Sequence, residues 1–154
     1  MISNSEKQQN YKTQFQRLKK AMDNAFYLEA VFIEYAIMED RAESILAYGG
    51  YKVKTRNSNG IATFGEKKKK IADVSREKKS LMHRYFSDDL MERTMEWVNE
   101  RNAVIHALLK KNTTTDGLRD FAERGESLCK ELRNRANNYK RMVERRKAKE
   151  GSNE

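Results

Sequence analysis

The chain of 154 residues is short enough for one domain, and we expect a single helical domain over 1–154. It has no proline, which permits uninterrupted helices, and its one cysteine, Cys129, excludes an internal disulfide and fits a cytoplasmic location. No run is long and apolar enough for a signal peptide or a membrane span, so we expect no membrane partner. The net charge of +9 favours an anionic partner, foremost nucleic acid, although a basic composition also serves solubility alone.

The first third of the chain is expected to be helical. Residues 1–10 are polar and are expected to fray, and a helix is predicted over 11–48, with a break at 23–24 permitted but not required. The part over 25–38 is apolar on nearly all sides, which is typical of a central bundle helix or of a subunit interface. The glycine pair at 49–50 ends this helix, because glycine adopts the left-handed conformation of a helix exit.

A basic loop is predicted over 51–63, followed by a helix over 64–79 that contains four consecutive lysines. Such a run is usually a solvated helix face, but it can also contact an RNA backbone. The candidate RNA contacts of the loop and the run are Lys52, Lys54, Arg56, Lys67, Lys68, Lys69 and Lys70. Two aromatic residues flank the loop, Tyr51 and Phe64, and they are the candidates for stacking on unpaired bases.

The second half of the chain contains two further long helices. Residues 81–86 form either a short helical continuation or a turn, and the acceptor side chains at 87–89 predict the start of a helix that ends near 111. After a linker at 112–116, the last helix carries one continuous apolar stripe, and it leads into a basic tail at 140–154. Short links favour antiparallel neighbours, so we expect an all-α, up-and-down bundle of four or five helices.

The strongest functional pattern is the hexapeptide RNAVIH at 101–106, which contains one of only two histidines. At 3.6 residues per turn, Asn102 and His106 share one helix face, and Arg101 flanks that face about 140° from His106. A histidine can move a proton near neutral pH and an arginine can hold phosphate oxygens, so this set suits cleavage of a phosphodiester. The alternative is a surface histidine beside a solvated arginine.

Those residues resemble the signature of the HEPN superfamily, helical-bundle proteins common among prokaryotic toxins, abortive-infection proteins and RNA-processing factors. The family pattern is an arginine and, four to six residues later, a histidine, often with a polar residue directly after the arginine; Arg101, Asn102 and His106 match it. The resemblance extends over most of the chain, from about 11 to 142, because the order of helices also fits.

The resemblance implies a metal-independent endoribonuclease of a toxin or phage-defence type, without a cofactor. His106 would take the proton of an RNA 2′-hydroxyl, Arg101 would neutralise the pentavalent phosphate, and Asn102 would orient the histidine or the phosphate. It also implies a homodimer in which two motifs meet across a two-fold axis. Leu108 stands where one toxin group of the family has a tyrosine that its antitoxin modifies, so an antitoxin partner of this chain would not act at that position.

One acidic residue, Glu39, continues an otherwise apolar helical row and needs a partner, because burying a lone carboxylate is costly. Arg101 is one candidate, which would add Glu39 to the catalytic set, and a lysine at the bundle edge is the other. His83 has no partner at a recognisable spacing and is expected to be structural, and no ligand cluster predicts a metal site. The alternative function is a non-catalytic helical module that binds RNA or a protein in a defence or mobile-element system.

Overall fold

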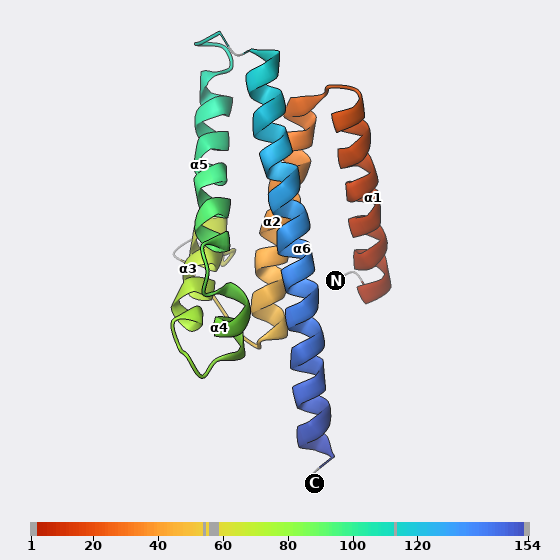
Figure 1. Cartoon of the computed structure of the whole chain (residues 1–154), viewed down its shortest axis with the longest axis vertical. Coiled ribbons are helices and arrows are strands. Elements are labelled where there is room, and N and C mark those ends of the chain that lie inside the picture. Colours follow the sequence, from red (N-terminus) through yellow and green to blue (C-terminus); the bar gives the residue numbers. More distant parts are fainter. Residues whose placement is uncertain (1–2, 54, 56–58, 113, 153–154) are drawn as a thin grey trace. The chain divides into compact units, whose positions relative to one another are not determined.

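The computed structural model describes residues 3–53, 55, 59–112 and 114–152 (Figure 1). These residues form no strand and six helices: α1 (Asn4–Asp23), α2 (Tyr27–Tyr48), α3 (Phe64–Ser75), α4 (Leu81–Phe86), α5 (Leu90–Ala107) and α6 (Thr115–Gly151). The expected all-α helical bundle is therefore confirmed. The helix count exceeds four or five because both the break after residue 23 and the short helix at 81–86 are present.

The chain divides into two compact units. Unit 1 comprises Met1–Met38 and Trp97–Cys129, and unit 2 comprises Glu39–Glu96 and Lys130–Glu154. The long helices α2, α5 and α6 each contribute one part to either unit. The hexapeptide at 101–106 therefore belongs to unit 1, whereas the lysine run at 67–70 belongs to unit 2.

The start of α1 differs from the expectation that residues 1–10 fray. The helix begins at Asn4, because a capping box closes its first turn. The Ser3 hydroxyl accepts a hydrogen bond from the Glu6 backbone N–H at 3.2 Å, and the Glu6 carboxylate accepts one from the Ser3 N–H at 2.7 Å. Such a box satisfies two backbone donors that the first turn of a helix leaves unpaired. The structure thus has a capped helix over the part of the expected frayed end that α1 includes.

The turn between α1 and α2 shows why the helix expected over 11–48 is interrupted. Ala25 adopts a φ of 58°, in the left-handed region that few residues other than glycine enter. The backbone N–H of Phe26 then donates to the Ala21 carbonyl at 2.8 Å, which satisfies one of the last carbonyls of α1. The next helix exit follows the prediction, because Gly50 is also left-handed, with a φ of 74°.

In unit 1 the parts of α1, α2, α5 and α6 run alternately in opposite directions (Figure 1). Trp97 is buried and stacks on Phe121, with ring centroids 4.8 Å apart and planes at 10°. Its indole N–H donates to the Phe121 carbonyl at 3.1 Å. A Cβ at Gly125 would lie only 2.6 Å from the Trp97 ring, so glycine allows α6 to approach α5 closely. Cys129 is fully buried in the core of unit 1.

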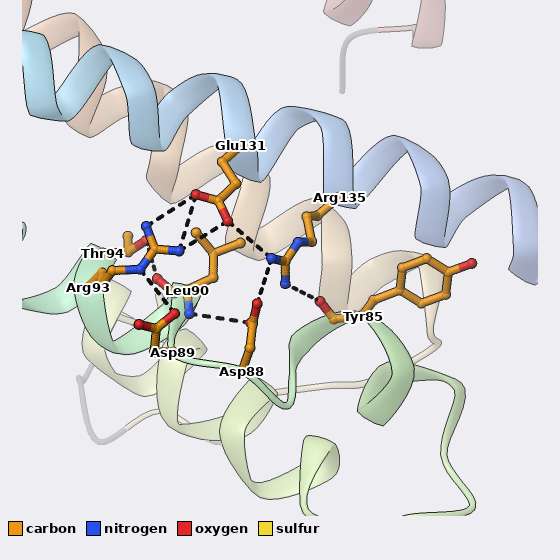
Figure 2. Close-up of polar contacts among 8 residues, drawn as sticks. All are labelled: Tyr85, Asp88, Asp89, Leu90, Arg93, Thr94, Glu131 and Arg135. Carbon is orange, nitrogen blue, oxygen red and sulfur yellow. Dashed lines mark hydrogen bonds and ion pairs between the residues drawn. The ribbon is translucent and has the colours of Figure 1, made fainter.

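In unit 2 a network of charged side chains holds the start of α5 to α6 (Figure 2). Arg93 forms a two-pronged ion pair with Glu131, with Nη2 to Oε1 at 3.0 Å, and its Nε donates to Asp89 at 3.0 Å. Arg135 bridges Glu131 and Asp88, and its hydrogen bond to Asp88 lowers the pKa of that carboxyl. Asp88 also accepts from the Leu90 N–H, so the predicted N-terminal acidic signal does act at this helix start.

Among the described helices, none combines the length and the hydropathy that crossing a membrane requires.

Candidate active site

Arg101 lies on α5 in unit 1, and aromatic rings of α2 hold its side chain. Its guanidinium carbon Cζ is 4.2 Å from the centroid of the Tyr35 ring and 5.3 Å from that of Phe32. Nη1 donates to the Asn102 side-chain oxygen Oδ1 at 2.9 Å. Stacking on an aromatic face orients a guanidinium without neutralising it. No carboxylate of the described residues pairs with Arg101. Its guanidinium can therefore bind an anionic ligand.

Asn102 and His106 are both exposed on α5, one turn apart, as the sequence predicts. The Asn102 side-chain oxygen accepts the hydrogen bond from Arg101. The two amide N–H groups of Asn102 are therefore the donors that can bind a ligand. His106 lies in the last turn of α5, and its imidazole faces solvent. The three residues of the hexapeptide thus supply a cation, an amide donor and a proton carrier on neighbouring positions of one helix.

Glu39 does not join this group. It belongs to unit 2, where its Oε1 lies 3.3 Å from the Lys67 ammonium. Of the two partners considered for Glu39, the lysine is the one present. Arg101 contacts aromatic rings and not the Glu39 carboxylate that was considered for it.

Lys67, a candidate RNA contact, is buried, and only 6% of its surface is exposed. Its ammonium lies 2.8 Å from Glu43 and 3.3 Å from Glu39. Burial alone would lower the pKa of Lys67, but the hydrogen bonds and charges of the two carboxylates outweigh it, and the pKa is raised. Lys67 therefore joins α3 to α2 within unit 2, and its burial and ion pairs favour a structural role over the predicted RNA contact.

The other predicted RNA contacts have different surroundings. Lys69 and Lys52 are exposed, Lys68 is half-buried, and the Lys70 ammonium lies 5.8 Å from the Tyr51 ring centroid. Phe64 is buried with 3% exposure, so it does not present a ring for stacking. The residues Lys54 and Arg56 lie outside the described part of the chain. Of the predicted RNA contacts in unit 2, Lys52, Lys68, Lys69 and Lys70 stay candidate phosphate contacts.

Replacing Lys67 by methionine should lower the free energy of unfolding by about 1 to 3 kcal/mol, because Glu39 and Glu43 lose a charged donor. Methionine keeps the apolar stem in place. Lys69→Met is the matched control, since Lys69 is exposed in the same helix and should change stability by less than about 0.5 kcal/mol. Urea unfolding of both variants measures the difference. Equal stabilities would contradict a structural role for Lys67.

Glu34 is a buried acid that the sequence analysis missed. It has no exposed surface, and among the described residues neither of its carboxylate oxygens has a hydrogen-bond partner. Burial, together with the charge of Glu126, raises the pKa of Glu34 to about 9. Gly125 lies directly against the carboxyl and leaves room for it. The available signal was an acidic residue in the middle of the segment 25–38, which contains only two acidic residues, Glu29 and Glu34.

A cavity of about 270 Å³ in unit 2 lies between α3, α4 and the start of α5, and its lining includes His83, Phe86 and Lys68. The Nδ1 atom of His83 lies 2.6 Å from the Ser75 carbonyl oxygen and must carry the proton there. That bond ties α4 to the end of α3, in agreement with the structural role expected for His83. No three metal-binding side chains gather at one place in the described part of the chain.

Comparisons of this chain with protein-family models, with curated proteins and with solved structures give no match. The interpretation of the site therefore depends on its own residues and geometry.

Proposed function

We propose that the protein is a metal-independent endoribonuclease of a toxin or phage-defence type, and that Arg101, Asn102 and His106 perform the cleavage. The observation that supports this most is the state of Arg101. Two aromatic rings orient its guanidinium, no described carboxylate neutralises it, and it lies five residues before an exposed histidine. An oriented and unneutralised guanidinium is suited to stabilising the negative charge that develops on a phosphate.

The proposed reaction is an internal transesterification of RNA. His106 removes the proton of the 2′-hydroxyl, the 2′ oxygen attacks the adjacent phosphorus, and the bond from phosphorus to the 5′ oxygen breaks. Arg101 and the N–H groups of Asn102 bind the non-bridging oxygens of the pentavalent phosphate. The leaving 5′ oxygen takes up a proton. The products are a 2′,3′-cyclic phosphate and a 5′-hydroxyl.

A homodimer belongs to this proposal, because one chain supplies one histidine at the site and the reaction needs both a base and an acid. In a two-fold dimer with the hexapeptides facing each other, the partner subunit's His106 protonates the leaving oxygen. Cleavage should then rise with the square of protein concentration below the dissociation constant of the dimer.

The direct test is cleavage of an end-labelled RNA in the presence of a chelator, followed by analysis of the product termini. We expect cleavage without divalent ions, with a 2′,3′-cyclic phosphate on one fragment and a 5′-hydroxyl on the other. A matched RNA with a 2′-deoxy sugar at the cleaved position should stay intact, since it lacks the attacking oxygen. A 3′-hydroxyl product, or a strict need for a divalent ion, would contradict the proposed chemistry.

The alternative proposal is a non-catalytic module that binds RNA or a protein partner in a defence or mobile-element system. The net charge of +9 and the exposed cations near the end of α6, such as Arg145, Arg146 and Lys147, favour it. It would be preferred if the protein bound RNA with an affinity that falls steeply with salt, but left both RNAs of the cleavage test intact. Binding that is insensitive to salt would point to a protein partner.

A further inference from the structure

We propose that the ring of Phe32 stacks on an unpaired nucleobase beside Arg101, so that the substrate is RNA that is single-stranded at the cleaved linkage. This inference rests on the proposed function and adds to it a substrate class and a specificity-determining residue. It concerns the recognition of the nucleotide and not the proton transfers, so a binding experiment can test it separately from cleavage.

Phe32 is the first observation. It has 52% of its surface exposed, although it lies in α2 between the fully buried Val31 and Glu34. The centroid of its ring is 5.3 Å from Cζ of Arg101. An exposed phenyl ring and an unneutralised guanidinium therefore lie side by side on unit 1. Such a pair can bind the two parts of a nucleotide, with the ring under the base and the cation on the phosphate.

The order of residues along the helices is the second observation. The parts of α2 and α5 in unit 1 are antiparallel, so the step from Tyr35 back to Phe32 leads in the same direction as the step from Arg101 to His106. At 1.5 Å per residue these steps are about 4.5 Å and about 7.5 Å along the axis. Along the helix axis, Phe32 therefore lies from Tyr35 in the same direction as His106 lies from Arg101, and both rings contact the Arg101 guanidinium.

The chemistry of stacking decides the substrate class. The faces of bases within a duplex are already covered by their neighbours, and the A-form major groove is too narrow for side chains to enter. A phenyl ring has no hydrogen-bonding group, so it binds the face of any unpaired base without selecting its edge. Stacking on the Phe32 ring thus predicts that the protein prefers single-stranded RNA and has little preference for base sequence.

A second copy of this chain is the other conceivable occupant of the ring. The charge beside Phe32 favours RNA, because the facing hexapeptides of the proposed dimer must leave room for the phosphate that Arg101 binds. A ring packed directly on the partner subunit would instead bury a positive charge that no described carboxylate pairs with. The experiment below distinguishes the two occupants.

The test uses Phe32→Trp in a His106→Ala background, which binds RNA without cleaving it under the proposed mechanism. The native Trp97 is 1% exposed, so a change in exposed tryptophan fluorescence reports position 32. We expect a single-stranded oligonucleotide to quench the fluorescence, and a duplex of the same length to leave it nearly unchanged. Phe26→Trp in the same background is the matched control, because Phe26 is 60% exposed directly before α2.

Each outcome decides the proposal. Quenching by the single strand at position 32 and not at position 26 supports it, as does a loss of single-strand affinity of about 5- to 150-fold in Phe32→Ala that Phe32→Tyr largely restores. Binding of the single strand without quenching overturns it. A blue shift that grows with protein concentration before RNA is added also overturns it, and assigns Phe32 to an interface between copies. If the wild-type protein fails to cleave RNA although the single strand still quenches Trp at position 32, the proposed catalysis alone is overturned.

Discussion

Replacing His106 by alanine should lower the rate of RNA cleavage by about 100- to 10,000-fold, the usual contribution of a positioned acid or base. The fold should not suffer, because His106 is exposed and its truncation leaves no cavity. Initial rates of cleavage, together with thermal unfolding of the same samples, measure both effects. RNA affinity should change little, since the phosphate contacts of Arg101 and the lysines remain.

The second histidine of the chain provides the control for this experiment. His83 lies in unit 2, where it is bonded to the Ser75 carbonyl, so His83→Gln should retain cleavage and at most lose some stability. Arg101→Lys keeps the charge but loses the planar guanidinium that stacks on Tyr35, and it should cleave poorly. Wild-type cleavage in His106→Ala would show that another residue transfers the proton and would refute the assignment of the site.

The second large effect concerns stability and comes from Glu34. Its pKa in the folded protein, about 9, is above the value of 4.5 for an unperturbed glutamate. Between these two values the folded state keeps a proton that the unfolded chain releases. The full stability of the fold with a neutral Glu34 is therefore present only below about pH 4.5. It is lost as the pH rises through 9, at about 1.4 kcal/mol for each pH unit between the two values. At pH 7 the free energy of unfolding is therefore lower than below pH 4.5 by on the order of 3 kcal/mol.

Glu34→Gln should remove this dependence, because an amide of the same shape cannot ionise. We expect the variant to be more stable than the wild type at pH 8 and to differ little from it at pH 5. Urea unfolding at the two pH values measures the change. Glu29→Gln is the matched control, since Glu29 is exposed on the same helix and its replacement should leave the pH profile unchanged. An unaltered pH profile in Glu34→Gln would mean that the buried carboxyl finds a partner in solution.

Local rules account for much of what the sequence predicts correctly. Absence of proline and regular apolar spacing indicated an all-α chain, and six helices are present among the described residues. Gly50 follows α2 in a left-handed conformation, and Asp88 accepts a hydrogen bond from the first N–H of α5. Both effects depend only on neighbours in the chain. The shared face of Asn102 and His106 follows from helix geometry alone.

The same local rules were available at Ser3 and Glu6, whose spacing is that of a capping box, although we expected this end to fray. The left-handed conformation of Ala25 is different. Nothing in its residue type favours a positive φ. The sequence permitted a break at 23–24, and the structure shows that the helix is interrupted there.

Tertiary structure decided which partner each charged residue has. The sequence by itself determined that Lys67 lies in a helical run of lysines and that Glu39 needs a partner, but only the packing of α3 on α2 brought these two together. It also placed Arg101 on Tyr35 and Phe32, and buried Glu34 against Gly125. The physical reason is that helical periodicity tells which face of a helix is apolar, whereas the energy of a charge depends on the atoms that face it from other helices.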